Sequence, residues 1–248
     1  MENVNIQYKE LLRKILDEGF EYTDKSRGVQ RKQITSTTLN IDLKQGFPAI
    51  NLKELYWKGI VGELIWFLNG DTNIKYLVDN NIHIWDKDAY NYHCKVSDNT
   101  IGKDEFKVKY DEFVNHIKTG NKQKVIAGSN YKFGELGRVY GSQWRNWFNP
   151  EYRTHGYIDQ ISNVIKGLRE NPMGTKHLVT AWNPAELNDM ALPPCHWSFE
   201  ILVEPIKCTS NYCYKNEGCE KTCCKDEPQY QFTLKWHQRS VDTFLGQM

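Results

Sequence analysis

The chain has 248 residues, enough for one large domain or two small ones with a substantial buried core. Its 32 Lys and Arg residues balance 31 Asp and Glu residues, which argues against a protein built mainly around the phosphates of nucleic acid. An aromatic content of 13% excludes an intrinsically disordered chain.

Targeting and membrane signals are not found in the sequence. No apolar run approaches the roughly 20 residues that a membrane span needs, and the N-terminus lacks the apolar segment of a signal peptide. We therefore expect a cytoplasmic protein, in the host cytoplasm if it is viral, with reduced cysteines and no DNA or membrane partner.

Helices are predicted mainly in the first two thirds of the chain, from apolar residues at helical spacing and from start and stop signals. Residues 55–70 are apolar nearly all round, which predicts a buried helix. Residues 92–133 are polar and predict an inserted surface segment. Residues 33–52 are expected to be extended. The other expected helices cover residues 8–16, 71–80, a short stretch near 110–118, and 158–170, and the first of them is expected to end at Gly19.

Three later segments predict strands. In residues 196–205 and 229–240 apolar and polar residues alternate, and residues 176–183 form a shorter candidate. Alternation with a period of two is typical of a sheet buried on one face. The expected fold class is α+β, a single domain over residues 1–248 with helices packed on a mixed, largely antiparallel sheet, and with a second insertion at about residues 206–228.

One cysteine stands in a distinctive context, "MALPPCHWSF", at residues 190–199. A lone Cys195 is more often a buried hydrophobe than a nucleophile. A nearby cation would favour the reactive thiolate, and Arg239 in "HQRSVD" follows a strand that could pair with the one after Cys195. Glu63 lies within the most apolar predicted helix, so it either reaches the surface or manages protons. Tyr140 and Arg145 in "VYGSQWR" are either packing residues or site residues.

The residues resemble the thymidylate synthase family. The motifs occur in the family's order and approximate spacing from about residue 8 to residue 246. They are "GFPAINLKE", "GELIWFLNGDTNIKYL", "IWD", "GELGRVYGSQWRNW", "VTAWNPAEL", "MALPPCHWSF" and "HQRSVDTFLG". The resemblance implies reductive methylation of dUMP to dTMP with 5,10-methylenetetrahydrofolate and no metal, in a homodimer that shares its active sites between subunits.

The resemblance also implies roles for individual residues. Cys195 would add to C6 of the pyrimidine, and Glu63, Tyr140 and His196 would manage protons and ordered water. Trp85 would pack against the folate, and Glu63 would also contact it. Gln238, Arg239 and Ser240 would hold the nucleotide. Asp242 would bind the pterin or the base.

Two phosphate-binding elements depart from the family pattern. The N-terminal loop reads "TDKSRGVQRKQ", where Arg27 is our choice for the phosphate ligand and Lys25 and Arg31 are alternatives. Where the family has paired arginines lent by the partner subunit, this chain has Lys176, which keeps one charge but loses the bidentate fork.

The sequence ends at "FLGQM", before the family's base-reading Asn, its ribose motif and its C-terminus. We therefore expect a truncated chain with little or no catalysis by itself. The alternatives are a dUMP or dCMP hydroxymethylase of the same fold, and a non-catalytic fragment that acts by subunit interaction. Uracil or cytosine specificity cannot be predicted without the base-reading segment.

A cysteine-rich stretch, "CTSNYCYKNEGCEKTCCKDEP", interrupts the last two predicted strands. Cys208, Cys213, Cys219 and Cys223, with Cys224 nearby, could offer four thiolates to Zn²⁺. Because the spacing lacks two paired CxxC motifs, we favour an exposed loop of ordinary thiols.

Overall fold

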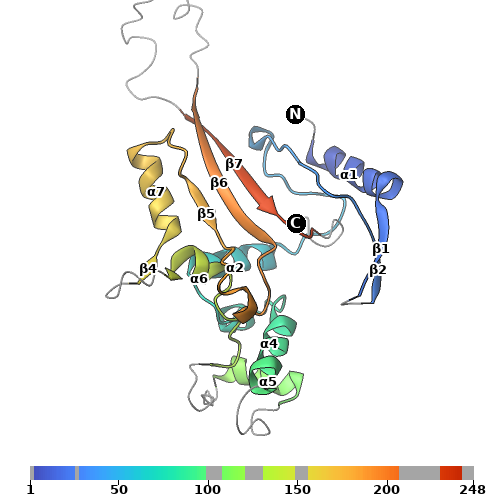
Figure 1. Cartoon of the computed structure of the whole chain (residues 1–248), viewed down its shortest axis with the longest axis vertical. Coiled ribbons are helices and arrows are strands. Elements are labelled where there is room, and N and C mark those ends of the chain that lie inside the picture. The colour runs from blue at the N-terminus through green and yellow to red at the C-terminus, as the bar shows by residue number, and fades with distance from the viewer. Residues whose placement is uncertain are drawn as a thin grey trace, which may run out of the picture. The chain divides into compact units, whose positions relative to one another are not determined.

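The structure of the chain, a computed structural model, describes residues 3–25, 28–98, 108–120, 131–148, 156–206 and 230–241. It divides into two compact units, one formed by residues 1–60 with 241–248 and the other by residues 61–240 (Figure 1). Arg27, Asp242 and the cysteine-rich stretch lie outside the described residues. The single domain over residues 1–248 stays a prediction.

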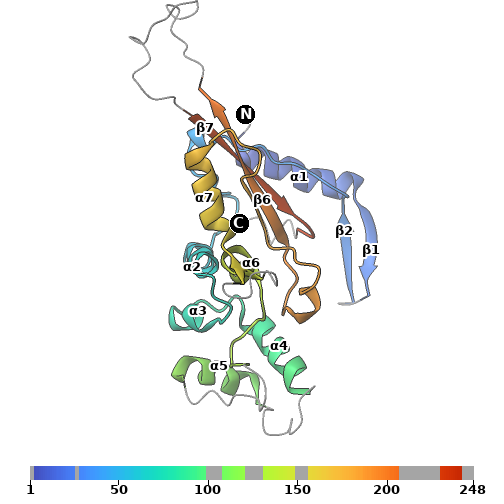
Figure 2. The same cartoon turned by 60° about the vertical axis from the view of Figure 1, so that its left-hand side comes forward.

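The first unit begins with α1 (Val4–Glu18), whose start is capped by Asn3 and whose end is at Gly19, as the sequence predicts. The chain continues into an antiparallel hairpin of β1 (Phe20–Asp24) and β2 (Val29–Gln33) (Figure 2). Of residues 33–52, expected to be extended, only Gln33 belongs to a strand, at the end of β2, and one turn of 3₁₀ helix, η1 (Leu43–Gln45), interrupts the rest.

The second unit carries a three-stranded antiparallel sheet in the order β5 (Leu178–Thr180), β6 (His196–Pro205) and β7 (Tyr230–Gln238). Two helices, α6 (Tyr140–Arg145) and α7 (Gln160–Glu170), lie beside β5 (Figure 1). A short ribbon of β3 (Trp147–Phe148) and β4 (Tyr157–Ile158) joins these helices, and η3 (Leu187–Asp189) follows β5. Helices on an antiparallel sheet confirm the predicted α+β class.

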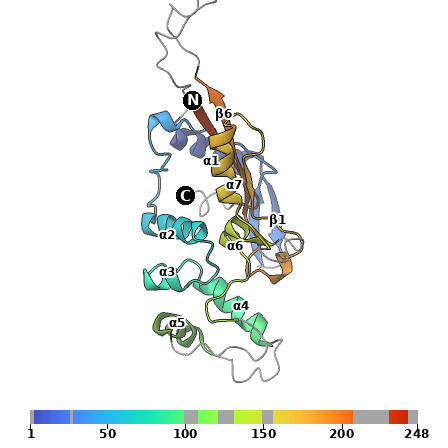
Figure 3. The ribbon, with the colours of Figure 1, turned by 90° about the vertical axis from the view of Figure 1, so that its left-hand side faces the viewer.

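The remaining helices precede the sheet in the sequence. They are α2 (Trp57–Leu68), α3 (Lys75–Asp79), α4 (Asp86–Asp98) and α5 (Tyr110–Thr119). Helices α4 and α5 lie at one end of this unit. The C-terminal end of β6 and the start of β7 lie at the opposite end (Figure 1 and Figure 3). The core is built from the apolar residues of these helices and of β5, with Trp66, Phe113, Leu136 and Val179 fully buried.

Three burial patterns differ from the sequence-based expectations. Helix α2 is not buried all round, because Val61, Leu64, Ile65 and Leu68 are 42–50% exposed. On β7, Phe232, Leu234 and Trp236 alternate as predicted but are 46–59% exposed, since the described residues that pack on this face cover β6 rather than β7. The segment at 92–133 is not only surface, since Phe113 and Ile117 of α5 belong to the core.

Candidate active site

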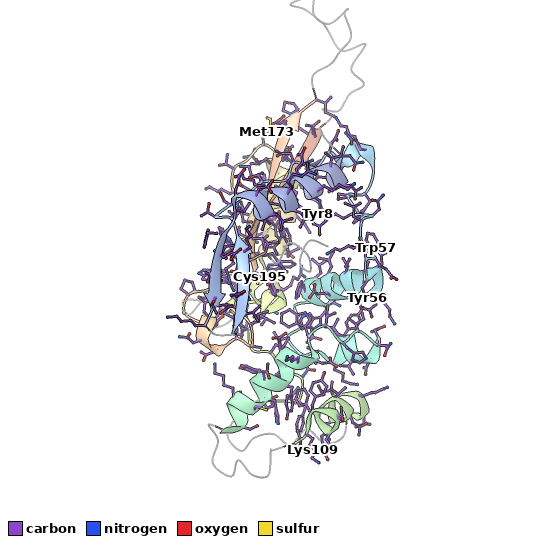
Figure 4. The ribbon with its side chains drawn as sticks, turned by 90° about the vertical axis from the view of Figure 1, so that its right-hand side faces the viewer. Tyr8, Tyr56, Trp57, Lys109, Met173 and Cys195 are labelled. Atoms are coloured by element: carbon purple, nitrogen blue, oxygen red, sulfur yellow. The ribbon has the colours of Figure 1, made fainter. Side chains whose placement is uncertain are left out.

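Sheet pairing brings the end of β7 to the start of β6. Strand β6 runs antiparallel to both of its neighbours. The residues just after β5, just before β6 and just after β7 therefore meet at the same end of the sheet. Cys195 immediately precedes β6 (Figure 4). The backbone N–H of Arg239, which follows Gln238 at the end of β7, donates a hydrogen bond of 2.8 Å to the Cys195 carbonyl. The predicted pairing of these segments is therefore observed.

Tyr140 lies directly beside Cys195. Its hydroxyl oxygen accepts a hydrogen bond of 2.7 Å from the Cys195 backbone N–H. The ring is 1% exposed and packs on Phe67 with 4.6 Å between ring centroids. Burial raises the pKa of Tyr140 well above its usual range, and the hydrogen bond from the Cys195 backbone offsets part of this rise. The phenol therefore keeps its proton and can donate it to a ligand.

Gly141 allows the helix that carries Tyr140 to approach the end of α2. A Cβ atom at position 141 would lie 2.8 Å from the Asp71 carbonyl oxygen and 2.9 Å from that of Phe67. Both contacts are with backbone atoms, which cannot turn away as a flexible side chain can. Close packing of α6 on α2 therefore sets the position of the Tyr140 hydroxyl.

Replacement of Gly141 by alanine is expected to lower the free energy of unfolding by roughly 1–3 kcal/mol, the usual cost of overpacking. Chemical denaturation at neutral pH measures the change. An unchanged midpoint would show that the backbone at this contact has room for a methyl group.

Glu63 is half-buried and is hydrogen-bonded to an indole. Its Oε1 accepts a hydrogen bond of 2.6 Å from Nε1 of Trp85. Burial raises the pKa of the Glu63 carboxyl, and the hydrogen bond from Trp85 offsets part of this rise. Glu63 is therefore half-buried and hydrogen-bonded, and its role in managing protons stays a prediction. Trp85 itself lies in the core, 6% exposed, so its contact with folate stays a prediction.

His196 lies between two aromatic rings. It stacks on Tyr140 at 4.1 Å between ring centroids and on Trp236 at 5.1 Å. Burial lowers the pKa of His196 to about 4, because the charged imidazolium loses its hydration there. The imidazole is therefore neutral at physiological pH and offers one donor and one acceptor nitrogen.

The lowered pKa of His196 predicts a loss of stability in acid. Between pH 6.5 and about 4 the unfolded chain binds a proton that the folded chain does not, so stability falls as the pH falls through this range. The loss reaches roughly 2–3 kcal/mol. We expect an NMR titration of His196 with a midpoint near 4, and a His196→Gln variant without this part of the acid destabilisation. A midpoint near 6.5 would contradict the prediction.

Arg239 is bonded to the turn that precedes Cys195. Its Nε donates to the Pro194 carbonyl at 2.9 Å and its Nη2 to the Pro193 carbonyl at 2.7 Å. The guanidinium carbon lies 5.4 Å from the centre of the Trp182 ring. The side chain thus crosses the start of β6 from β7 toward β5, and N–H groups on Nη1 and Nη2 are left for an anion.

The other predicted site residues are placed less closely together. Ser240 follows Arg239 with a left-handed φ of 50°, and its hydroxyl oxygen accepts a long hydrogen bond of 3.5 Å from Arg239 Nη1. Gln238 pairs with His196 in the sheet and is exposed. Lys176 precedes β5, whose Leu178 lies opposite Glu200. At roughly 3.3 Å per residue, this puts Lys176 far along the sheet from Cys195 in the same chain.

Some predictions cannot be compared with the structure. Arg27, Asp242 and the cysteines from Cys208 to Cys224 lie outside the described residues. Within the described part of the chain, no group of three or more His, Cys, Asp or Glu residues is arranged to hold a metal ion. The helices in that part are all too short or too polar to cross a membrane.

Sequence reasoning missed two aromatic neighbours of the site. Trp182 packs under the Arg239 guanidinium, and Trp236 stacks on His196. The sequence did contain a signal for both, since a tryptophan stands at or near the end of each strand that flanks β6.

Comparison with known proteins gives two findings. The family model described as thymidylate synthase matches residues 6–248. A curated protein named thymidylate synthase, from Mesoplasma florum, is 38% identical over 248 residues, a match that covers 97% of this chain and 68% of the relative.

Proposed function

Because the chain belongs to the thymidylate synthase family, we propose that its active site converts dUMP to dTMP with 5,10-methylenetetrahydrofolate. The Cys195 thiolate adds to C6 of the pyrimidine and turns C5 into an enolate-like nucleophile. C5 attacks the one-carbon unit of the folate and then loses its proton. The tetrahydrofolate leaves and transfers a hydride to the one-carbon unit, the thiolate departs from C6, and dTMP and dihydrofolate result.

The observation that carries the proposal is the arrangement of Cys195 and Tyr140. The Cys195 backbone is held on both sides, through its N–H by the Tyr140 hydroxyl and through its carbonyl by the Arg239 N–H. A nucleophile on a fixed backbone presents its side chain in a defined direction, which is the main requirement for addition to one carbon of a bound ring. Tyr140 is protonated and its hydroxyl is hydrogen-bonded to that backbone. It is therefore suited to assist the removal of the proton from C5 of the pyrimidine.

Glu63 and His196 support the steps that move protons. A carboxyl whose pKa is raised by burial holds its proton to a higher pH than an exposed carboxyl does, which suits a proton relay to the pyrimidine carbonyl. A neutral His196 beside the nucleophile can order water through its two ring nitrogens without adding positive charge. Both residues are half-buried, and fixed polar groups in a site that excludes part of the solvent favour a charged intermediate more strongly than water does.

Arg239 would bind the phosphate of dUMP, assisted by Ser240. The N–H groups of Arg239 that the prolines leave open form part of a planar fork that matches phosphate oxygens. Lys176 lies too far along the sheet to join this group in one chain, so it would serve the site of a partner subunit. The proposal therefore includes a homodimer, which light scattering after size-exclusion chromatography would detect at twice the mass of 29.1 kDa.

The experiment that tests the proposed function measures tritium release from C5-labelled dUMP, together with protection of Cys195 from iodoacetamide by dUMP. Cys94, the other cysteine in the described residues, serves as the internal control. Release that requires the folate, with protection of Cys195 alone, supports the proposal. Protection without release would support the non-catalytic alternative. Absence of both would contradict the proposed function.

A further inference from the structure

Three strand ends meet around the turn that carries Cys195. The end of β5 supplies Trp182, the start of β6 supplies Pro193, Pro194 and Cys195, and the end of β7 supplies Arg239. The Arg239 side chain passes over the turn, and its guanidinium reaches the Trp182 ring on the other side at 5.4 Å. The Arg239 side chain therefore connects the ends of β7 and β5 over the turn that carries Cys195.

The guanidinium is fixed by two kinds of contact. Its Nε and Nη2 donate hydrogen bonds to the carbonyl oxygens of Pro194 and Pro193, and these two bonds fix the orientation of the guanidinium plane. The Trp182 ring faces the group and adds a cation–π contact, which is strongest with tryptophan among the aromatic residues. An arginine side chain loses rotamer entropy on being ordered, so a support that orders it before the ligand arrives improves binding.

Trp182 is itself held by the sheet. Its backbone N–H donates to the Thr180 hydroxyl at 3.2 Å, and that hydroxyl donates to the Trp197 carbonyl at 3.2 Å. The N–H of the preceding residue, Ala181, donates to the same carbonyl at 2.8 Å. On the other side, Asn183 is bonded through its side chain to Glu186 at 3.1 Å. The backbone that carries the indole is therefore fixed, and the side chain of Trp182 is half-buried.

We infer that Trp182 is a positioning residue that holds the Arg239 guanidinium in place to receive the phosphate of the nucleotide. The inference rests on the proposed function, in which Arg239 binds the phosphate of dUMP. It assigns Trp182 no contact with the substrate. Its effect is specific to the phosphate, because the pyrimidine and the sugar do not depend on the plane of the guanidinium.

The test compares the affinities of dUMP and deoxyuridine, which differ by the phosphate alone. Titration calorimetry is done on the whole chain carrying Trp182→Ala, Trp182→Phe or Trp197→Ala. Trp197→Ala is the matched control, since Trp197 lies on β6 and its ring contacts His237 rather than Arg239. We expect Trp182→Ala to weaken dUMP binding about tenfold and Trp182→Phe about threefold, with deoxyuridine binding unchanged. Trp197→Ala should leave the ratio of the two affinities at its wild-type value.

A second measurement needs no nucleotide. The Arg239 Nε–H signal in a ¹⁵N-edited NMR spectrum, identified by its loss in Arg239→Lys, should carry a ring-current shift that disappears in Trp182→Ala. An affinity ratio that stays at the wild-type value in Trp182→Ala, or a signal that does not move, overturns the inference. A wild-type chain that binds dUMP no better than deoxyuridine contradicts the proposed function instead, and the NMR signal still decides whether Trp182 holds Arg239.

Discussion

In an assembly of this chain that turns over dUMP, replacement of Cys195 by alanine is expected to abolish turnover, with a loss of about 10⁴-fold or more in kcat. The thiolate makes and breaks the bond to C6, and no other described residue in the arrangement could take its place. Serine has nearly the same volume but a much weaker nucleophile at neutral pH, so Cys195→Ser should lose almost as much. Tritium release from C5-labelled dUMP measures both losses.

The loss at Cys195 should not come from unfolding. The hydrogen bonds to Tyr140 and Arg239 involve the Cys195 backbone, and they survive a change of side chain. We therefore expect Cys195→Ala to bind dUMP and to unfold close to the wild-type midpoint. Cys94→Ala, which removes the thiol on α4, is the matched control and should keep wild-type turnover. Turnover that survives in Cys195→Ala, or is lost in Cys94→Ala, would show that the nucleophile is wrongly assigned.

The three strands β5, β6 and β7 and most helices could be predicted from local sequence, because their signals lie within a few residues of one another. The short strands β1 to β4 and the helices α4 and α6 were not predicted. The alternation in residues 196–205 fits β6, and Gly19 ends α1 as expected. Burial was harder to predict. The apolar runs of α2 and β7 have the composition of core elements, yet part of each is exposed among the described residues. Apolar composition shows that a surface can be buried, whereas the partner that buries it is a property of the whole fold.

The candidate site was predicted by residue type but not by contact. Cys195, Glu63, Tyr140 and Arg239 could be singled out because their chemistry is unusual for their surroundings in the sequence. The bond between Tyr140 and Cys195 joins residues 55 positions apart, and that between Trp85 and Glu63 joins residues 22 apart. Such contacts depend on how α6 and α4 pack, which no local pattern specifies. The roles of these residues follow from the resemblance to a family, and the residues that contact them are known from the structure.

Replacement of Glu63 by glutamine is expected to lower kcat by about 10²–10³-fold, the usual contribution of a positioned acid or base. Glutamine keeps a carbonyl oxygen that can accept the Trp85 N–H, so the loss would arise from the missing proton and not from the missing bond. The KM for dUMP should change little, because the phosphate contacts lie at Arg239. Steady-state kinetics separate the two parameters. A lower affinity with kcat unchanged would instead make Glu63 a binding residue.

The same substitution should change how stability depends on pH. Burial raises the pKa of Glu63 above 4.5, so the folded chain keeps a proton that the unfolded chain releases as the pH rises from 4.5. This contribution to stability is complete below pH 4.5 and is lost as the pH rises through the raised pKa. Since glutamine does not titrate, the stability of Glu63→Gln relative to wild type should increase with pH over this range. Urea denaturation of both proteins from pH 4 to 8 measures the difference, and a difference independent of pH would show that Glu63 is not held in a desolvated site.

Trp85→Phe removes the bond that lowers the pKa of Glu63, so in that variant the loss of stability should extend to higher pH.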